Sequence, residues 1–306
     1  MKILVTGSNG QLGQEFRRLS QRDPVHEFIF TDILELDITN RQSVDQLFMD
    51  HKFEAVINCA GYTAVDKAET DSSAAFELNG ASVGHLASNA SKAGAILIHF
   101  STDYVFDGKN YKPYTEEDIP NPQSVYAKSK YQGELETLKH ASKGIIFRTS
   151  WLYSEFMNNF VKTIINKGSE RGHLNIVYDQ VGTPTYSGDL ADAILTIPPA
   201  LKDQHGVEIY HYSNEGVVSW YDFAKAIVEF SGIKCEISPI LTEQYLLPAA
   251  RPAYSVLNKA KFKQKFGLEI PYWRDSLREC VKIMTNYELR IKANSEQRIA
   301  NNLRQI

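Results

Sequence analysis

The stretch "KILVTGSNGQLG", residues 2–13, decides the fold class. A short apolar run ends at Gly7, and Gly10 and Gly13 follow at intervals of three residues. Glycine permits a tight turn after a strand, lets the backbone approach a pyrophosphate, and leaves the N–H groups of a helix N-terminus facing it. The spacing is one residue wider at the front than the usual dinucleotide fingerprint. Alone, the triplet fits a plain tight turn equally well, but its place in the first strand-to-helix turn favours a nucleotide site.

Beyond this stretch, further apolar runs alternate with helix-like segments. The runs are continuously apolar, which is typical of parallel strands buried on both faces. This order predicts an α/β fold, namely a doubly wound parallel-sheet Rossmann domain with helices on both faces. The expected strands are "EFIFTD" (27–32), "EAVINCAG" (54–61), "ILIHFSTD" (96–103) and "GIIFRTSW" (144–151), and the expected helices between them are 11–22, 41–52 and 73–94.

The second half of the chain predicts a smaller, interwoven region. We expect a Rossmann domain over residues 1–150, a mainly substrate-binding region over 151–284 that sends segments back to the sheet, and a C-terminal extension over 285–306. No internal repeat or low-complexity linker marks a clean boundary. The extension is polar and weakly periodic, so it fits either a docked helix or a frayed tail. Further strands are expected at 175–180 and 208–214, and further helices at 156–167, 187–196 and 219–230.

The composition excludes several classes of function. A net charge of −4 and a pI near 6.1 imply no basic face, so nucleic acid is not an expected partner. The three cysteines lack metal or redox spacing and the eight histidines lack metal-ligand spacing, which predicts no metal site and a reducing, cytoplasmic compartment. The apolar run at the N-terminus is too short for a signal peptide or a membrane span, so no membrane association is expected.

The carboxylates after the second strand bear on the choice of cofactor. Asp32 ends that strand, where a carboxylate can accept hydrogen bonds from ribose hydroxyls and would repel a 2′-phosphate. Asp32 therefore favours NADH, although nearby Arg41 could soften this preference, and NADPH or NADH remains open. Asp37 fits either an adenine contact or a helix cap. The small residues of "NCAG" (58–61) would let a cofactor lie across the end of the third strand.

A tyrosine and a lysine in "QSVYAKSKYQGE" (123–134) are candidates for proton transfer. Tyr126 and Lys130 are four residues apart and therefore share one face of a helix, whereas Lys128 and Tyr131 point elsewhere. A phenol has a pKa of about 10, and an adjacent ammonium should lower it towards the working range. Lys130 could also reach the ribose hydroxyls of a cofactor. Taken alone, such a pair is common on helix surfaces.

A third group changes the interpretation of that pair. The stretch "FSTDYVFDG" (100–108) ends the strand before this helix, at the edge where open α/β sheets bind ligands. Ser101 or Thr102 could there hold a substrate carbonyl. A hydroxyl donor, a tyrosine acid and a lysine beside a nicotinamide site predict reduction of a ketone or oxidation of an alcohol, with the proton supplied by Tyr126.

These residues resemble the extended short-chain dehydrogenase/reductase family, and within it the dTDP-4-dehydrorhamnose reductases. The resemblance covers residues 1 to about 284. The stretches "YTAVDKAE" (62–69) and "RPAYSVL" (251–257) are particular to these reductases, whereas "VTGSNGQLG" and "YAKSK" are shared by many sugar-nucleotide enzymes. The other stretches that carry it are "STDYVFDG", "RTSWLY", "DQVGTPTYSGDLA" and "GVVSWYDFAKAI".

The resemblance implies an activity and a set of site residues. The activity is reduction of the C4 ketone of dTDP-4-dehydro-β-L-rhamnose to dTDP-L-rhamnose with NADPH or NADH. Catalytic roles fall to Thr102, Tyr126 and Lys130. Cofactor contacts fall to Gly10, Gln11, Leu12, Asp32, Asp37, Ile38, Ala60, Gly61, Tyr62 and Lys130, besides the other loop glycines, Gly7 and Gly13. Sugar-nucleotide contacts fall to Thr63, Val65, Thr102, Asp103, Tyr104 and Trp151, with Arg251 at the diphosphate.

The chain departs from the family pattern at three places. Gly61 stands where alanine is common, which should only loosen the cofactor floor. Glu15 matches one acid of a magnesium site through which some members dimerise, but Gly188 stands where a second acid would align. We therefore expect no metal and a monomer or weak homodimer. The third departure is the extension after Met284, about which the resemblance says nothing.

Several alternatives stay open. Trp151 fits core packing as well as stacking on the sugar or base, whereas Arg251 fits a phosphate ligand better than a structural ion pair. An epimerase or dehydratase shares the scaffold, although a dehydratase needs an added acid–base pair where this chain has Asp103 followed by Tyr104. A non-catalytic regulatory subunit, like the partner of methionine adenosyltransferase, is the alternative from another class. The intact Tyr126–Lys130 pair speaks against it.

Overall fold

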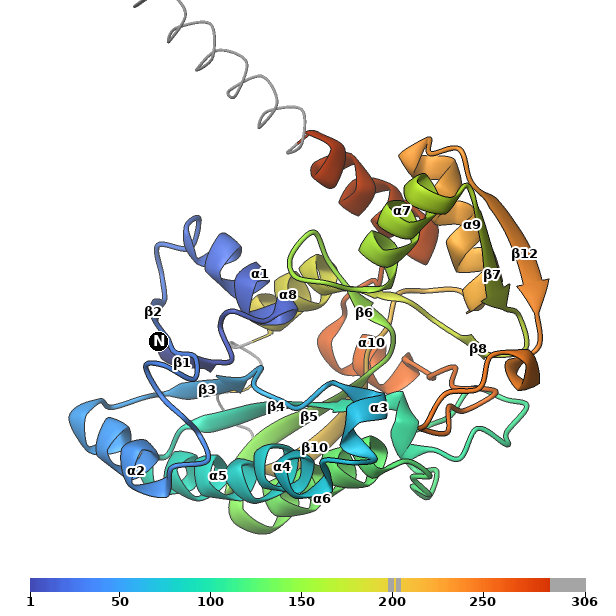
Figure 1. Ribbon diagram of the computed structural model, residues 1–306. Helices are drawn as coiled ribbons and strands as arrows, with labels where there is room; N and C mark the ends of the chain where they lie inside the picture. The colour runs from blue at the N-terminus through green and yellow to red at the C-terminus, as the bar shows by residue number, and fades with distance from the viewer. Residues whose placement is uncertain (198–200, 202–204, 287–306) are drawn as a thin grey trace, which may run out of the picture.

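A six-stranded parallel sheet forms the centre of the protein (Figure 1). The computed structural model describes residues 1–197, 201 and 205–286. The strand order β10-β5-β4-β3-β1-β2 confirms the predicted doubly wound sheet. The strands are β1 (Lys2–Thr6), β2 (Glu27–Phe30), β3 (Ala55–Asn58), β4 (Ile96–Thr102), β5 (Lys143–Thr149) and β10 (Gly206–His211).

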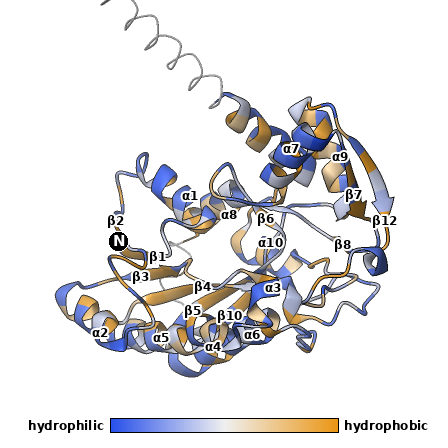
Figure 2. Cartoon of the chain, in the orientation of Figure 1, coloured by the Kyte–Doolittle hydropathy of each residue, from blue (hydrophilic) through white to orange (hydrophobic). Residues whose placement is uncertain are grey.

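Helices cover both faces of this sheet, because its strands are apolar on both sides. Ile3 and Ile57 pack into the core under one helical layer, whereas the intervening Leu4 and Val56 pack into the core under the other. The apolar strands lie between these layers in Figure 2. One layer comprises α1 (Gln11–Ser20), α8 (Ser187–Thr196) and α10 (Ala260–Phe266), and the other comprises α2 (Arg41–Asp50), α5 (Ser82–Ala93) and α6 (Val125–His140).

The helix expected over residues 73–94 is interrupted by a π-helical turn. It consists of α4 (Ser72–Phe76), the π-helix η1 (Glu77–Ala81) and α5. A short helix, α3 (Val65–Ala68), precedes it. A Cβ on Gly133 of α6 would lie 2.2 Å from the carbonyl oxygen of Asn79, so α6 can pack against this turn only because residue 133 is glycine. Inserted π-turns of this kind often mark functional sites.

The second half of the chain builds a smaller core beside the sheet. Phe223, Leu277 and Val161 are buried there, between helices and a two-stranded parallel sheet of β7 and β12. Helix α7 begins at Phe160 and not at the expected residue 156, because Asn159 caps it by accepting a hydrogen bond from the Lys162 N–H. The other elements are α7 (Phe160–Arg171), β7 (His173–Val177), α9 (Trp220–Ser231), β12 (Glu236–Ile240) and a helix over 273–286.

Short strand pairs connect the two parts. Strand β10 returns to the sheet beside β5 after the chain has passed through the smaller region. The remaining elements are η2 (Asp103–Val105), β6 (Leu152–Tyr153), β8 (Val181–Gly182), β9 (Thr185–Tyr186), β11 (Val218–Ser219) and η4 (Thr242–Gln244). In the described part of the chain, no helix is long and apolar enough to cross a membrane. The predicted extension, 285–306, lies outside the described residues except for its first two.

Candidate active site

A cleft of about 740 Å³ lies between the carboxyl edge of the sheet and the smaller region. The ends of β3, β4 and β5, the glycine-rich turn and helix α6 line it together with residues 157–160. Most residues predicted for the site line this cleft. They are Gly10, Gln11, Leu12, Ala60, Gly61, Thr63, Val65, Thr102, Asp103, Tyr104, Tyr126, Lys130 and Trp151.

The glycine-rich turn has the geometry of a phosphate-binding loop. Gly7 has a φ of +62°, and a Cβ there would lie 2.4 Å from the backbone nitrogen of Ala60. A Cβ on Gly13 would lie 2.4 Å from the carbonyl oxygen of Gly7, so both positions require glycine. Gly10 occupies the N-cap of α1 without a side-chain cap. The first N–H groups of the helix are therefore free to bind a cofactor pyrophosphate.

The residues predicted to lie near the adenosine part of the cofactor, Asp32, Asp37 and Ile38, have different surroundings. The Asp32 carboxylate accepts hydrogen bonds from the N–H groups of Asn9 and Ile33, each at 2.8 Å. The bond from Asn9 holds Asp32 beside the glycine-rich turn. The cap reading of Asp37 is wrong, because Asn40 caps α2 by accepting a hydrogen bond from Ser43. Ile38 is buried in the core, which leaves only its backbone for a cofactor.

Helix α6 presents Tyr126 and Lys130 to the cleft, as the spacing predicts. Ser124 caps the helix and orients its first turn. Lys130 is buried and Tyr126 is half-buried, whereas Lys128 is exposed and Tyr131 packs against a separate apolar cluster. The two residues predicted for proton transfer therefore line the cleft, whereas Lys128 and Tyr131 do not.

The electrostatics of that pair differ from the prediction. Burial raises the pKa of Tyr126 to about 12, and the nearby Thr102 hydroxyl opposes this shift only in part. Burial lowers the pKa of Lys130 to about 8, against the charge of Glu134. The expectation that Lys130 lowers the phenol pKa is therefore not met in the chain without ligands. At neutral pH Tyr126 carries its proton, which is the state needed for donation.

Asn79, which the sequence interpretation missed, builds the floor beside Lys130. Its side chain accepts a hydrogen bond from the Tyr62 N–H at 2.8 Å and donates to the Ser129 hydroxyl at 2.9 Å. A Cβ on Gly61 would lie 3.2 Å from the Asn79 amide oxygen and 3.7 Å from the Lys130 ammonium. Gly61 therefore makes room for this network as well as for a cofactor. The only feature of the sequence that could have indicated this role is an asparagine among small residues.

Strand β4 ends with Ser101 and Thr102, the two hydroxyl residues predicted as candidates to hold a substrate carbonyl. The Ser101 hydroxyl donates to the Glu134 carboxylate, so it is already engaged. The Thr102 hydroxyl donates to the Asp103 carboxylate at 3.1 Å and accepts from the Tyr104 N–H at 3.2 Å. Burial raises the pKa of Asp103 to about 7. The Tyr104 ring meets the Tyr126 ring edge to face, at 6.1 Å between centroids.

Aromatic side chains form the wall opposite the sheet. Trp151 stacks on Trp220, with ring centroids 3.6 Å apart and planes 9° apart. Phe160 approaches Trp220 at 4.5 Å. Trp151 has a φ of +47°, an uncommon backbone conformation for a non-glycine residue. The packing reading of Trp151 is therefore confirmed, whereas stacking on the sugar or base stays a prediction for a residue that also lines the cleft. Trp220 was missed by the sequence interpretation.

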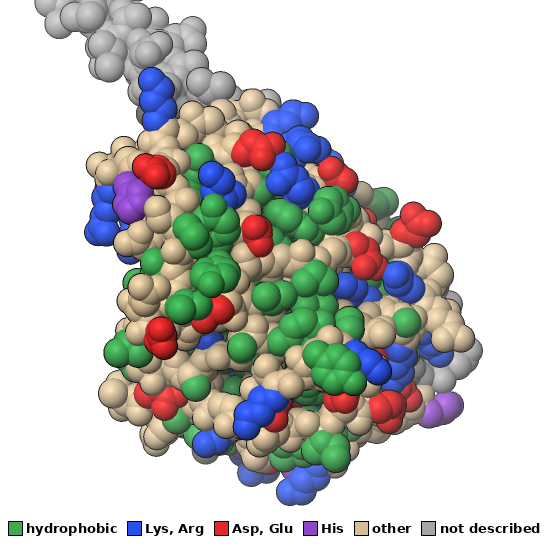
Figure 3. Space-filling view, turned by 90° about the vertical axis from the view of Figure 1, so that its right-hand side faces the viewer, with side chains coloured by type: hydrophobic (Ala, Val, Ile, Leu, Met, Phe, Trp, Pro, Cys, Tyr) green, Lys and Arg blue, Asp and Glu red, His purple; other side chains and the backbone are tan. Residues whose placement is uncertain are grey.

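Arg251 lies in a second cavity, of about 520 Å³, that adjoins the cleft through Tyr104, Phe160 and Trp220. Lys167 and Arg171 also line it. Figure 3 views this side of the molecule and shows hydrophobic side chains among charges of both signs.

The guanidinium of Arg251 is paired within the protein. It donates to both carboxylate oxygens of Asp66, at 2.8 and 2.7 Å. Arg251 therefore forms the structural ion pair that the sequence interpretation disfavoured, and its contact with a diphosphate stays a prediction. The pair joins α3 of the sheet region to the segment that follows η4.

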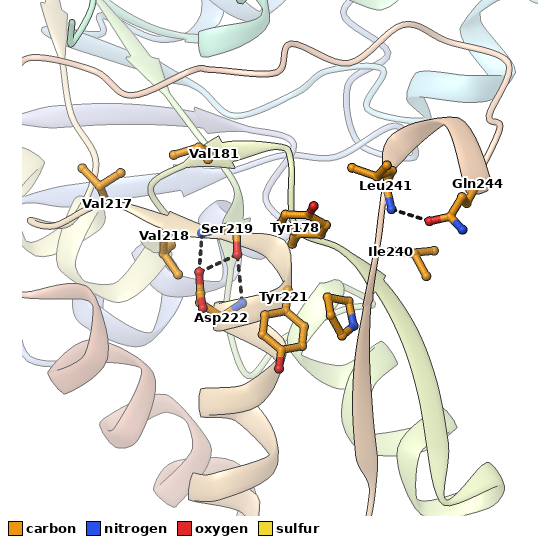
Figure 4. Close-up of a pocket in the computed structure, with 11 residues that line it drawn as sticks. Tyr178, Val181, Val217, Val218, Ser219, Tyr221, Asp222, Ile240, Leu241 and Gln244 are labelled. Carbon is orange, nitrogen blue, oxygen red and sulfur yellow. Dashed lines mark hydrogen bonds between the residues drawn. The ribbon is translucent and has the colours of Figure 1, made fainter. Parts of the chain in front are cut away.

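A third hollow, of about 790 Å³, contains none of the predicted site residues (Figure 4). Its walls are mostly apolar, and Tyr178 and Tyr221 face into it. Its carboxylate, Asp222, is engaged with Ser219 at the start of α9. The hollow therefore offers no charged group for catalysis.

Glu15, the residue matched to a metal ligand of the family, forms an ion pair with Arg18. The Glu15 carboxylate accepts a hydrogen bond from Arg18 at 2.8 Å, and burial together with Glu155 raises the pKa of Glu15 to about 7. Within residues 1–197 and 205–286, no cluster of three histidine, cysteine or acidic side chains is placed to hold a metal ion. The absence of a metal remains a prediction.

The parallel sheet, glycine-rich turn and Tyr–Lys helix define an oxidoreductase of the short-chain dehydrogenase/reductase class. A family model described as the RmlD substrate binding domain matches residues 1–286. The chain belongs to this family, which confirms the resemblance drawn from its motifs.

Known relatives cover nearly the whole chain. The dTDP-4-dehydrorhamnose reductase of Aggregatibacter actinomycetemcomitans is 40% identical over 285 residues, or 90% of this chain and 97% of that protein. A crystal structure of a dTDP-4-dehydrorhamnose reductase from Clostridium acetobutylicum is 42% identical with a TM-score of 0.89, over 93% of this chain and 100% of that one. That of the Bacillus anthracis reductase, in complex with NADP, is 36% identical with a TM-score of 0.87, over 91% and 98%.

Proposed function

We propose that this protein reduces the C4 ketone of dTDP-4-dehydro-β-L-rhamnose to dTDP-L-rhamnose with NADPH or NADH. The observation that carries the proposal is the convergence of Tyr126, Lys130 and Thr102 with the glycine-rich turn in one cleft. The names of the relatives support the substrate, and the NADP in the Bacillus anthracis complex supports the cofactor.

Each catalytic group has a role that follows from its chemistry. A bound NAD(P)H supplies the hydride that reduces the ketone carbon. The Thr102 hydroxyl exchanges its hydrogen bond to the Asp103 carboxylate for one to the ketone oxygen, and it orients that oxygen. Tyr126 gives its proton to that oxygen as charge develops there, and its raised pKa keeps the proton available until then. The Lys130 ammonium binds the cofactor ribose and thereby fixes the position of the nicotinamide.

The adjoining cavity fits the nucleotide part of the substrate. Its cationic side chains, Lys167, Arg171 and Arg251, suit a diphosphate, since guanidinium groups bind phosphate oxygens through paired hydrogen bonds. Trp151, with Trp220 behind it, offers a flat aromatic surface to the sugar or base. Thr63, Val65 and Tyr104 complete the path between cavity and cleft. The division into regions 1–150 and 151–284, and a monomer or weak homodimer, are part of this proposal.

The test is an assay of cofactor oxidation. Loss of NADPH or NADH absorbance is followed with freshly generated dTDP-4-dehydrorhamnose, and the product is analysed by mass and by its stereochemistry at C4. Formation of dTDP-L-rhamnose is the expected result. The ratio of kcat/KM for the two cofactors resolves what Asp32 and Arg41 leave open.

Other outcomes would replace the proposal. A product of opposite configuration at C4 keeps the mechanism and the substrate, and changes the assignment to a talose-forming reductase. Interconversion of epimers without net cofactor oxidation identifies an epimerase. Cofactor binding without turnover on any sugar nucleotide favours the regulatory subunit.

A further inference from the structure

A buried row of polar residues crosses three strands beneath helix α6. Ser101 of β4 lies opposite Arg148 of β5, and Arg148 lies opposite His211 of β10. Above this row, α6 contributes Glu134, whose side chain is fully buried. A buried carboxylate of this kind is costly unless it is paired and hydrogen-bonded, so its contacts need an explanation.

The Glu134 carboxylate joins helix α6 to strands β4 and β5. Glu134 accepts hydrogen bonds from Arg148 Nε at 2.9 Å and Arg148 Nη2 at 2.7 Å. It accepts a third from the Ser101 hydroxyl at 2.5 Å. The Arg148 guanidinium also lies over the Phe106 ring, 5.2 Å from its centroid. The ion pair is therefore held by two hydrogen bonds between its members, by the Ser101 hydroxyl and by the Phe106 ring.

This junction lies directly behind the catalytic groups. Glu134 follows Lys130 by one helical turn and Tyr126 by two, so the three share a face of α6. Ser101 immediately precedes Thr102 on β4. A displacement of α6 along the sheet would change the distance between the Tyr126 phenol and the Thr102 hydroxyl.

We propose that Glu134 is a positioning residue for the proposed reduction, on which this inference rests. Its contacts with Ser101 and Arg148 hold the helix that carries Tyr126 and Lys130 in register with the strand that carries Thr102. Its negative charge favours the ammonium form of Lys130.

Several groups face Lys130, and Glu134 is the charged one among them. Glu134 approaches from α6, His99 from β4, and Cys59 from the segment after β3. Tyr126, also from α6, lines the same cleft as Lys130. Burial lowers the pKa of His99 and raises that of the Cys59 thiol, so both are uncharged near neutral pH. Burial also keeps Tyr126 neutral. Removing the charge of Glu134 should therefore lower the pKa of Lys130 below its value of about 8.

The experiment uses Glu134→Gln in the full chain, with two independent measurements. The first is NADH affinity as a function of pH, followed by fluorescence without any sugar substrate. In the wild type, affinity falls as Lys130 loses its charge, and in the variant this fall should move about one pH unit lower. The second is turnover with the sugar nucleotide, where kcat should fall by about tenfold or more because the reacting groups are misplaced.

Matched variants separate positioning from stability. Glu136→Gln changes the same residue type on the same helix, where Glu136 contacts Gln132 and not the strands, and should leave both measurements unchanged. Glu134→Gln combined with Arg148→Met removes the uncompensated cation and should recover thermal stability, while the pH dependence of NADH affinity stays displaced. If Glu134→Gln does not fold, Ser101→Ala removes a single hydrogen bond to the carboxylate and should lower kcat several-fold.

A purely structural role would give a different result. A folded Glu134→Gln variant with wild-type kcat and wild-type pH dependence of NADH affinity overturns the inference, as does an unaffected Ser101→Ala. If the wild type itself does not turn over the sugar nucleotide, the proposed function fails, and the NADH titration still decides the effect of Glu134 on Lys130.

Discussion

The proposed cofactor end and the proposed substrate end of the site are built in different ways. At the cofactor end, the proposed phosphate-binding turn is one continuous stretch, residues 7–13, whose shape is set by backbone geometry and by the absence of side chains. The proposed substrate end is assembled from side chains at residues 63, 65, 102–104, 151, 152, 157–160, 220 and 251, which meet only in the folded chain.

Because of this difference, we expect a substitution at one end to impair that end and to leave the other intact. A substitution in the glycine-rich turn should keep the backbone from approaching the cofactor closely, and it should therefore lower cofactor affinity. A defect among the distant side chains should appear in turnover or in sugar-nucleotide affinity instead. Substitutions can break or sharpen this contrast.

The largest effect should come from Tyr126→Phe. The change keeps the ring and removes the proton donor, so kcat should fall by about 10²- to 10⁴-fold while NADH affinity is retained. Steady-state kinetics and fluorescence titration measure the two quantities. Tyr131→Phe, five residues further along the same helix, is the control and should have little effect. Turnover near the wild-type rate in Tyr126→Phe would remove Tyr126 from the mechanism.

Gly7→Ala should produce the opposite defect. The added Cβ would lie 2.4 Å from the Ala60 nitrogen, in a backbone conformation with φ of +62°. Because the turn must shift, we expect the NADH Kd to rise by about a hundredfold with little change in sugar-nucleotide affinity. Gly94→Ala has a similar φ of +69° but open space around the new Cβ, so it isolates backbone strain from the clash. Equal effects of the two variants on NADH binding would contradict the close approach.

A smaller effect is expected at the substrate end from Arg251→Met. It removes both hydrogen bonds to Asp66 and the cation proposed for the diphosphate. We expect KM for the sugar nucleotide to rise about tenfold, with a smaller change in kcat and none in NADH affinity. Arg274→Met, which breaks the exposed pair with Glu229, is the control. A loss confined to NADH affinity would show that the two ends are not independent.

The smallest effect concerns stability and pH at Asp103. Burial raises the pKa of Asp103 from 3.8 to about 7. Between these values the folded chain keeps a proton that the unfolded chain releases, so rising pH destabilises the fold, fully so above pH 7. Asp103→Asn should therefore melt a few degrees higher than the wild type at pH 8, and the two should converge near pH 4.

Asp107 provides a control of opposite sign. Hydrogen bonds, first that from the Lys109 N–H, hold its pKa below the usual range. Asp107 therefore contributes stability above its unfolded pKa, which is lost as the pH falls through the folded value. Asp107→Asn should melt slightly lower than the wild type at neutral pH. A gain in melting temperature at pH 8 for both variants would contradict the assignment of the Asp103 effect to burial.

The sequence by itself determined the sheet, the glycine-rich turn and the pairing of Tyr126 with Lys130. These features depend on local rules, since a strand needs a run of apolar residues, a close turn needs glycine, and residues four apart share a helical face. The choice between Ser101 and Thr102, and the roles of Asn79 and Trp220, could not be read in the same way.

Only the tertiary structure decided these remaining points. The Ser101 hydroxyl is bound to Glu134, 33 residues away. Arg251 is paired because Asp66, 185 residues away, lies beside it. The pKa of Tyr126 is raised and not lowered, because burial outweighs its neighbours. Such contacts join distant segments, and burial depends on everything packed around a group, so neither leaves a local pattern in the sequence.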